Sequence, residues 1–196
     1  MVNLLTIGVL GLQGAVREHL DCLNALPDIT GIAVKKAADI SAVDALILPG
    51  GESTTMGKLL EEFKLTRVLA ASIQSGIPVW GTCAGMILLA RAIAGEPGCH
   101  LGLMDITVQR NAYGSQLDSF TTTVLIPKVS DMPIPLVFIR APYVVKAGPG
   151  VEILATVADK IVAVEQSNML ATAFHPELTS NLEFHRYFVA KVRKQK

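Results

Sequence analysis

The sequence predicts an α/β protein: a three-layer sandwich with a mostly parallel central sheet, helices on both faces and antiparallel additions in its second half. Strand and helix patterns alternate through the first half, as in parallel sheets joined by helical crossovers. Hydrophobic residues make up 51% of the 196 residues and charged residues 17%, which suits a sheet buried on both faces. From residue 105 to residue 174, short runs rich in Thr, Val and Ile, divided by Pro, Gly and Asp, indicate antiparallel strands.

The expected elements of the first half follow one another closely. A buried strand at residues 5–10 leads through a glycine-containing turn into a helix that ends before Pro27. Val16, Leu20 and Leu23 recur at the spacing of one helical face. Further strands are expected at residues 32–34, 45–48 and 77–80, and further helices at residues 54–62, 66–75 and 86–93.

The last expected helix begins near Ser180. Ser180 and Glu183 have the spacing of a capping box, in which each side chain accepts a hydrogen bond from the other residue's backbone N–H. The apolar stripe of this helix would consist of Phe184, Tyr187, Phe188 and Val192.

Length and composition narrow the class of protein. The chain fits a single domain spanning residues 1–196. Lys plus Arg and Asp plus Glu both number 17, so the net charge is zero and no nucleic-acid partner is expected. The longest apolar runs are too short to span a bilayer, and we expect a cytoplasmic protein with no membrane partner. Three cysteines, odd in number and widely spaced, favour neither disulfides nor a metal site.

Residues 81–85, Gly-Thr-Cys-Ala-Gly, join an expected strand to an expected helix. A cysteine between small residues at such a junction is typical of a nucleophile elbow, whose apical residue takes a strained backbone conformation. The N-terminal end of the following helix would favour the thiolate of Cys83. An ordinary buried cysteine is the alternative interpretation.

His175 and Glu177 follow the apolar run at residues 169–174. On extended backbone, residues two apart project to the same side, and Pro176 would keep the segment extended. The imidazole could then face a nucleophile with one nitrogen while the carboxylate holds the other, as a thiol–histidine–acid triad requires. An isolated surface turn is the alternative, but the presence of the elbow favours the triad.

Residues 49–53, Pro-Gly-Gly-Glu-Ser, form another loop between a strand and a helix. Adjacent glycines let the backbone approach a ligand closely, and the N–H groups of Gly51 and Ala84 could form an oxyanion hole. The spacing of Gly51 and Gly57 does not fit a phosphate-binding loop. The first turn does not have the glycine spacing of a dinucleotide-binding fingerprint.

The turn at residues 11–14 is expected at the same carboxyl edge of the sheet as the 49–53 loop. The peptide between Gly50 and Gly51 could adopt two orientations at little steric cost, only one of which serves the oxyanion. Gln13 could hold the active orientation when a partner docks. A plain turn with a solvated glutamine is the alternative.

The elbow, the downstream His-Pro-Glu and the Pro-Gly-Gly-Glu-Ser loop together resemble the class I glutamine amidotransferases. Five ordered motifs narrow this resemblance to the glutaminase subunits of pyridoxal 5′-phosphate synthase. They lie at residues 8–19, 48–56, 110–114, 138–142 and 174–179, and the resemblance covers essentially the whole chain.

The resemblance implies a glutamine amidotransferase-like fold and the hydrolysis of L-glutamine to L-glutamate and ammonia; no cofactor is expected. It implies Cys83 as nucleophile, His175 as general base and then acid, and Glu177 as the orienting carboxylate. The implied substrate-binding residues are Gly51, Glu52, Ser53, Arg110, Ile139 and Arg140. The implied partner is a barrel-shaped synthase subunit, in a hetero-oligomer, that consumes the ammonia with ribose 5-phosphate and glyceraldehyde 3-phosphate.

Some residues depart from this pattern or stand outside it. Ser115 occurs where arginine is expected and Tyr143 where relatives often have histidine. His19, on the first expected helix, is interpreted as a surface or interface residue. Cys99 and His100 lie in a Gly/Pro-containing loop without a second ligand pair, which disfavours a metal site.

Two alternatives of other classes compete with this interpretation. A cysteine hydrolase or chaperone-like protein of similar fold, not acting on glutamine, would commonly have histidine directly after the cysteine, where this chain has Ala84. A nucleotide-binding module would need the phosphate loop that the glycine spacing does not provide.

Overall fold

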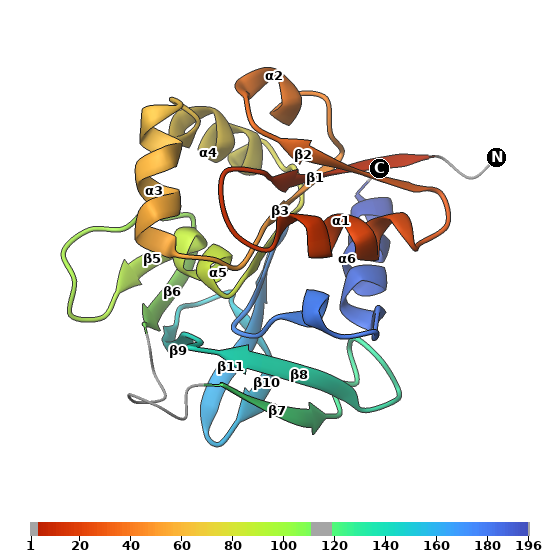
Figure 1. Cartoon of the computed structure of the whole chain (residues 1–196). Helices are drawn as coiled ribbons and strands as arrows, with labels where there is room; N and C mark the ends of the chain where they lie inside the picture. Colours follow the sequence, from red (N-terminus) through yellow and green to blue (C-terminus); the bar gives the residue numbers. More distant parts are fainter. Residues whose placement is uncertain (1–3, 111–118, 196) are drawn as a thin grey trace.

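The computed structural model describes residues 4–110 and 119–195, and it has the three-layer α/β architecture that the sequence predicts (Figure 1). The elements in chain order are β1 (Leu5–Leu10), α1 (Val16–Asn24), β2 (Ile29–Val34), α2 (Ala37–Ile40), β3 (Ala45–Leu48), α3 (Ser53–Glu62), α4 (Thr66–Gln74), β4 (Val79–Thr82), α5 (Ala84–Leu89), β5 (Ala90–Ile93), β6 (Met104–Gln109), β7 (Ser119–Val124), β8 (Ile134–Ile139), β9 (Tyr143–Ala147), β10 (Glu152–Val157), β11 (Lys160–Gln166), β12 (Met169–Thr172), the 3₁₀ turn η1 (Pro176–Leu178) and α6 (Glu183–Lys194).

The main sheet has the strand order β2-β1-β3-β4-β12-β11-β9-β6-β5, with β10 pairing with β11 outside this path. Its first five strands in this order are parallel to one another. β11 is antiparallel to β12, β10 and β9, and β9 is antiparallel to β6. β7 and β8 form a separate antiparallel pair. The expected division into a parallel half and antiparallel additions is therefore confirmed.

Helices cover both faces of the parallel half of the sheet (Figure 1). The chain crosses from β1 to β2 in one direction along the sheet, and from β2 through β3 to β4 in the opposite direction. Because such crossovers are right-handed, α1 lies on one face of the sheet and α2, α3 and α4 lie on the other. Helix α6 shares the face of α1, because rings from both helices pack against Trp80 of β4. α2 contacts α4, and α3 contacts α5. Among residues 4–110 and 119–195, no helix has the length and apolarity needed to cross a membrane.

The expected helix at residues 86–93 is wrong in its second half. Helix α5 ends at Leu89, and Ala90–Ile93 form strand β5, parallel to β6. The run of Ala, Leu and Ile has helical propensity, but backbone hydrogen bonding to β6 overrides it. This is a tertiary effect that local pattern does not reveal.

Two other boundaries differ from expectation. The strand expected at residues 77–80 is β4 at Val79–Thr82, because Pro78 has no N–H and the pairing with β12 continues to Thr82. The last helix begins at Glu183 without the expected Ser180 capping box. Instead, the Asn181 side chain accepts a hydrogen bond from the Glu183 N–H at 3.0 Å.

Candidate active site

The cysteine at the end of β4 adopts the strained turn that the sequence predicts. Cys83 has φ 47° and ψ −101°, outside the conformations that residues with side chains prefer. A methyl group on Gly81 would lie 2.4 Å from the Gly85 carbonyl oxygen, and one on Gly85 would lie 2.0 Å from that of Leu48. Glycine is therefore required on both sides, and the turn leaves Cys83 in the wall of a pocket.

Beside β4, strand β12 leads into the segment that holds His175 and Glu177. His175 Nδ1 lies 2.7 Å from Glu177 Oε1, and both residues are buried. The expected extended backbone is wrong here, because Pro176 begins the turn η1. Proline suits the first position of a helical turn, since its φ is fixed and it needs no hydrogen-bond acceptor. The two side chains meet across this turn.

The backbone of His175 is anchored to the smaller sheet. Its N–H donates to the Val137 carbonyl of β8 at 2.8 Å. The β7–β8 pair thereby helps to fix the position of the His175 imidazole relative to the end of β12.

The imidazole of His175 bridges the thiol and the carboxylate. Burial lowers the pKa of His175, but hydrogen bonds to Cys83 and Glu177 outweigh this effect and raise the pKa to about 10. A ring that readily holds a proton between a thiol and a carboxylate supports the thiolate–imidazolium pair used by cysteine nucleophiles.

The loop at residues 49–53 packs directly against this group. A methyl group on Gly50 would lie 2.3 Å from His175 Cε1. The Gly50 carbonyl accepts a hydrogen bond from the Ala15 N–H at 2.9 Å, before α1. Because the peptide is trans, the N–H of Gly51 points away from that helix.

Gln13 holds the next peptide of the same loop. Its Oε1 accepts a hydrogen bond from the Glu52 N–H at 2.9 Å, so it is not the solvated side chain of the alternative interpretation. Gly14 has φ 101°, and a methyl group there would lie 1.9 Å from the Gly50 oxygen. The turn after β1 and the loop after β3 are thus locked together by backbone contact.

A pocket of about 330 Å³ opens above the thiol. Its lining contains each residue that the sequence associates with substrate or oxyanion, together with Ile87, which the sequence did not point to. The lining residues are Gln13, Gly51, Glu52, Ser53, Cys83, Ala84, Ile87, Arg110, Ile139, Arg140 and His175. Glu177 stands behind His175, outside the lining.

Arg110 lies at this pocket within a cluster of opposite charges. Its Nη2 lies 3.3 Å from Glu52 Oε1 and 3.2 Å from Thr54 Oγ1, and its Nη1 lies 3.1 Å from Glu96 Oε2. A substrate carboxylate would therefore share this guanidinium with protein carboxylates. Ser115 lies outside the described residues, and Tyr143 begins β9 with Lys160 Nζ 5.0 Å from its ring centroid.

Two buried histidines near Glu177 were missed by sequence reasoning. His19 is fully buried, so its interpretation as a surface or interface residue is wrong, and His185 is fully buried as well. Both lie on apolar helical stripes: His19 is three residues after Val16 and four before Leu23, and His185 is three residues before Phe188 and four before Val189. That spacing was the available signal.

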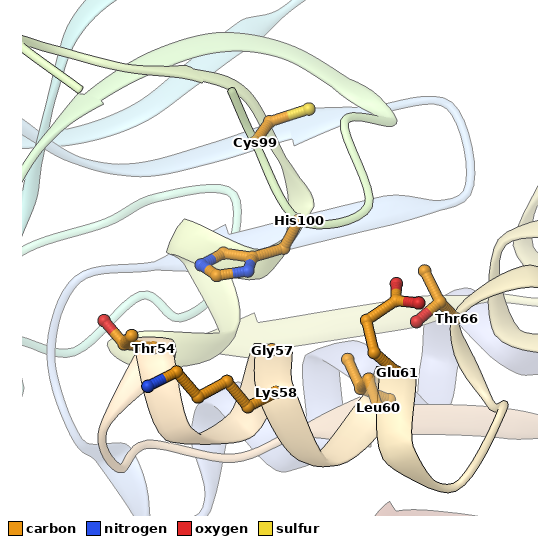
Figure 2. A pocket seen from close by; sticks show the side chains of 8 residues that line it. All are labelled: Thr54, Gly57, Lys58, Leu60, Glu61, Thr66, Cys99 and His100. Carbon is orange, nitrogen blue, oxygen red and sulfur yellow. The ribbon is translucent and has the colours of Figure 1, made fainter. Parts of the chain in front are cut away.

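A neighbouring pocket of about 380 Å³ lies along α3, away from the thiol. Figure 2 shows the His100 ring over α3 at Gly57, with Lys58 and Thr54 on the helix below. A methyl group on Gly57 would lie 2.3 Å from His100 Nδ1, so the ring packs tightly. Cys99 is exposed. In residues 4–110 and 119–195, no cluster of three His, Cys, Asp or Glu residues could hold a metal ion.

Known proteins match nearly the full chain. A family model described as the SNO glutamine amidotransferase family matches residues 9–194. The "Pyridoxal 5′-phosphate synthase subunit PdxT" of Ruminiclostridium cellulolyticum is 56% identical over 186 residues, 95% of this chain and 98% of the relative. The protein of the same name from Caldanaerobacter subterraneus subsp. tengcongensis is 52% identical over 183 residues, 93% and 97% of the two chains.

Solved structures match the fold. A crystal structure described as a glutamine amidotransferase superposes with a TM-score of 0.90 and 41% identity, covering 95% of this chain and 98% of the other. PurLQS from Thermotoga maritima superposes with a TM-score of 0.62 at 16% identity, covering 97% and 98%, a similarity of fold alone.

Proposed function

The chain belongs to the SNO glutamine amidotransferase family, and on this basis we propose that it is the glutaminase subunit of a pyridoxal 5′-phosphate synthase. It hydrolyses L-glutamine to L-glutamate and ammonia, and it supplies the ammonia to a partner synthase subunit. Relatives named as subunits of that synthase, more than half identical over nearly their full length, support this assignment.

The observation that carries the chemistry is the hydrogen-bonded series of Cys83, His175 and Glu177 at one pocket. Cys83 Sγ attacks the carboxamide carbon after passing its proton to His175. The N–H groups of Gly51 and Ala84 stabilise the developing oxyanion. His175 returns the proton to the leaving nitrogen, the C–N bond breaks, and ammonia leaves a thioester on Cys83.

Hydrolysis of the thioester uses the same residues in the reverse sense. His175 takes a proton from water, and the oxygen adds to the thioester carbon. The C–S bond then breaks to release glutamate, and His175 returns the proton to Cys83 Sγ. Glu177 orients His175 in both steps. Glu52, Ser53, Arg110, Ile139 and Arg140 bind the substrate, with Arg110 or Arg140 near the substrate carboxylate because a guanidinium fits a carboxylate in a bidentate manner.

Control by the partner is part of this proposal. The hydrogen bonds from Ala15 and to Gln13 set the orientation of the 49–53 loop, and docking of the synthase would press on the turn that carries both. Loss of one oxyanion donor typically costs roughly a hundred- to a thousandfold in rate, so reorientation of one peptide is sufficient for control. The barrel shape of the partner and the hetero-oligomer remain predictions.

Glutamine turnover tests the proposed function. We expect ammonia release by the chain with saturating synthase subunit, weaker release without it, and none from Cys83→Ala that remains folded by circular dichroism. Glu177→Gln should lose less activity than Cys83→Ala, because it removes orientation rather than the nucleophile. Near-wild-type release by Cys83→Ala would overturn the triad. No release under any condition would favour a cysteine hydrolase that does not act on glutamine.

The single domain and the cytoplasmic location also stay predictions. Limited proteolysis tests whether residues 1–196 form one glutaminase domain, and cleavage into two stable fragments would contradict this. A cytoplasmic location is tested by cell fractionation.

A further inference from the structure

A layer of buried polar side chains lies beneath the proposed triad, between α1, β4 and α6. His19 Nε2 lies 3.4 Å from Glu177 Oε2 and 3.2 Å from Thr82 Oγ1. His19 Nδ1 lies 3.1 Å from His185 Nε2. The side chains of His19 and Glu177 are completely shielded from solvent. The four groups come from four different elements, so their meeting is a product of the whole fold.

The second carboxylate oxygen of Glu177 connects this buried layer to the proposed triad. Oε1 is satisfied by His175, whereas Oε2 is buried and has no hydrogen-bond partner among the described residues. A buried carboxylate oxygen without compensation is costly. The ring of His19 is the group that faces it.

The proton positions follow from which buried atoms have partners. His185 Nδ1 has no hydrogen-bond partner among the described residues, and a buried lone pair costs less than a buried N–H without an acceptor. His185 therefore carries its proton on Nε2 and donates to His19 Nδ1. His19 is then protonated on Nε2, which points an N–H rather than a lone pair toward Thr82 and Glu177.

From this arrangement we propose that His19 is a positioning residue for the proposed triad. Its Nε2–H donates to Thr82 Oγ1 and lies beside Glu177 Oε2, where its positive end attracts the carboxylate and keeps it turned toward His175. His185 fixes the tautomer and rotation of the His19 ring. The inference rests on the proposed function, because it assigns His19 a role through Glu177 and His175.

The electrostatic environment of His19 favours a neutral imidazole. Burial, His185 and His175 all lower the pKa of His19 well below its usual value. The groups that face this layer are Thr82 and Trp80 from β4, His185 from α6, His175 and Glu177 near η1, and Cys22 one turn further along α1. Burial raises the pKa of Cys22 to about 11, so its thiol is neutral near pH 7.

The first test compares two substitutions in the chain with saturating synthase subunit. His19→Leu removes the donor, whereas His19→Gln keeps an N–H near the place of Nε2. We expect His19→Leu to lower kcat roughly ten- to a hundredfold, the range that is typical when an outer partner that orients a metal ligand is lost. KM should stay nearly unchanged, and His19→Gln should recover most of the loss.

The pH profile separates positioning from packing. Burial lowers the pKa of His175, and hydrogen bonds to Cys83 and Glu177 raise it. Without the donor, Glu177 holds His175 less well, so the basic limb of kcat/KM should move to lower pH in His19→Leu. Cys22→Ala, on the same buried face of α1, is the control for lost packing and should leave this limb unchanged. A wild-type kcat and basic limb in folded His19→Leu, or a His19→Gln as impaired as His19→Leu, would overturn the inference.

Wild-type protein provides a test that does not depend on the folding of a variant. Nitrogen-15 NMR should find His19 protonated on Nε2 and unprotonated on Nδ1. The opposite tautomer would aim a lone pair at the carboxylate and overturn the inference. Loss of hydrolysis in Cys83→Ala with normal hydrolysis in His19→Leu would leave the proposed function standing and remove only the role of His19.

Discussion

The backbone at Cys83 holds a side chain in a conformation that a side chain disfavours. With φ 47° and ψ −101°, the residue sits where strain of about 1–3 kcal/mol is typical, and the surrounding sheet and helix must compensate for it. The benefit is chemical, because the strained turn presents the thiol to the pocket at the start of α5. Stability and reactivity therefore oppose each other at this single residue.

Substitutions at Cys83 can measure this strain directly. We expect Cys83→Gly to be more stable than Cys83→Ala by about 1 kcal/mol, because glycine accepts positive φ without a clash. Urea unfolding followed by circular dichroism gives the two free energies of unfolding. Ala84→Gly, in the first turn of α5, is the control and should lose about 1 kcal/mol. Equal stability of the two Cys83 variants would mean that the turn is unstrained.

The protonation of His175 links the site to stability. Burial alone would lower the pKa of His175, but hydrogen bonds to Cys83 and Glu177 raise it to about 10, against about 6.5 in an unfolded chain. The stabilisation is fully present below about pH 6.5 and is lost as the pH rises through about 10. His175→Gln should therefore cost more free energy of unfolding at about pH 7 than at about pH 10.5.

His100→Gln is the matched control for this pH effect. Burial lowers the pKa of His100, so its ring is neutral across the same range and the cost of its loss should stay constant. If the cost of His175→Gln were also constant, the protonated ring would not be what stabilises the folded chain.

At the scale of elements, the turn before α1 and the loop before α3 act as one unit. Gln13 and Ala15 hold two successive peptides of the loop, and Gly14 touches the Gly50 oxygen where only a glycine fits. Displacing either segment must therefore displace the other. Under the proposed function, a partner that touches one loop would therefore also move the proposed oxyanion donors.

Paired substitutions test this coupling. A methyl group on Gly51 would lie 2.4 Å from Gln13 Oε1, so Gly51→Ala should lose about 1–3 kcal/mol of stability. Adding Gln13→Ala should restore part of that loss, because the clashing atom is gone. Gly50→Ala is the control, since its methyl group would meet His175 and Gln13→Ala should not rescue it. Strict additivity in the Gly51 pair would contradict the contact.

At the scale of the whole molecule, the fold places three free thiols in three different environments. Cys83 lines the pocket, Cys99 is exposed, and Cys22 is buried with its pKa raised to about 11. Their reactivities should therefore differ in the folded chain and converge when it unfolds.

A glutamine-like chloromethyl ketone should label Cys83 first, because the pocket would bind the glutamine-like group beside this thiol. Cys22 should stay unlabelled near pH 7. Mass spectrometry of the native protein checks the order, and the same reagent in concentrated urea is the control, where all three should react alike. Cys99 labelled before Cys83 in the native protein would argue against a glutamine site.

The sequence predicted those features that depend on residues close together in the chain. Alternating patterns and glycine spacing are local, and they predicted the parallel half, the elbow and the loop beside it. The strand at residues 90–93 depends on pairing with β6 and does not follow from local pattern. The helical spacing of His19 indicated its buried face, but its contact with His185 depends on how α1 packs against α6. The turn at Pro176 was misjudged because proline suits both extended and helical backbone.

The hydrogen bond from the His175 N–H to the Val137 carbonyl also makes local opening of the fold measurable. An amide proton held between two sheets exchanges with deuterium only when those sheets part locally. The exchange rate of the His175 amide therefore reports how often the β7–β8 pair separates from the end of β12. Its exchange time measures how long the backbone of His175, the proposed base, stays bound to β8.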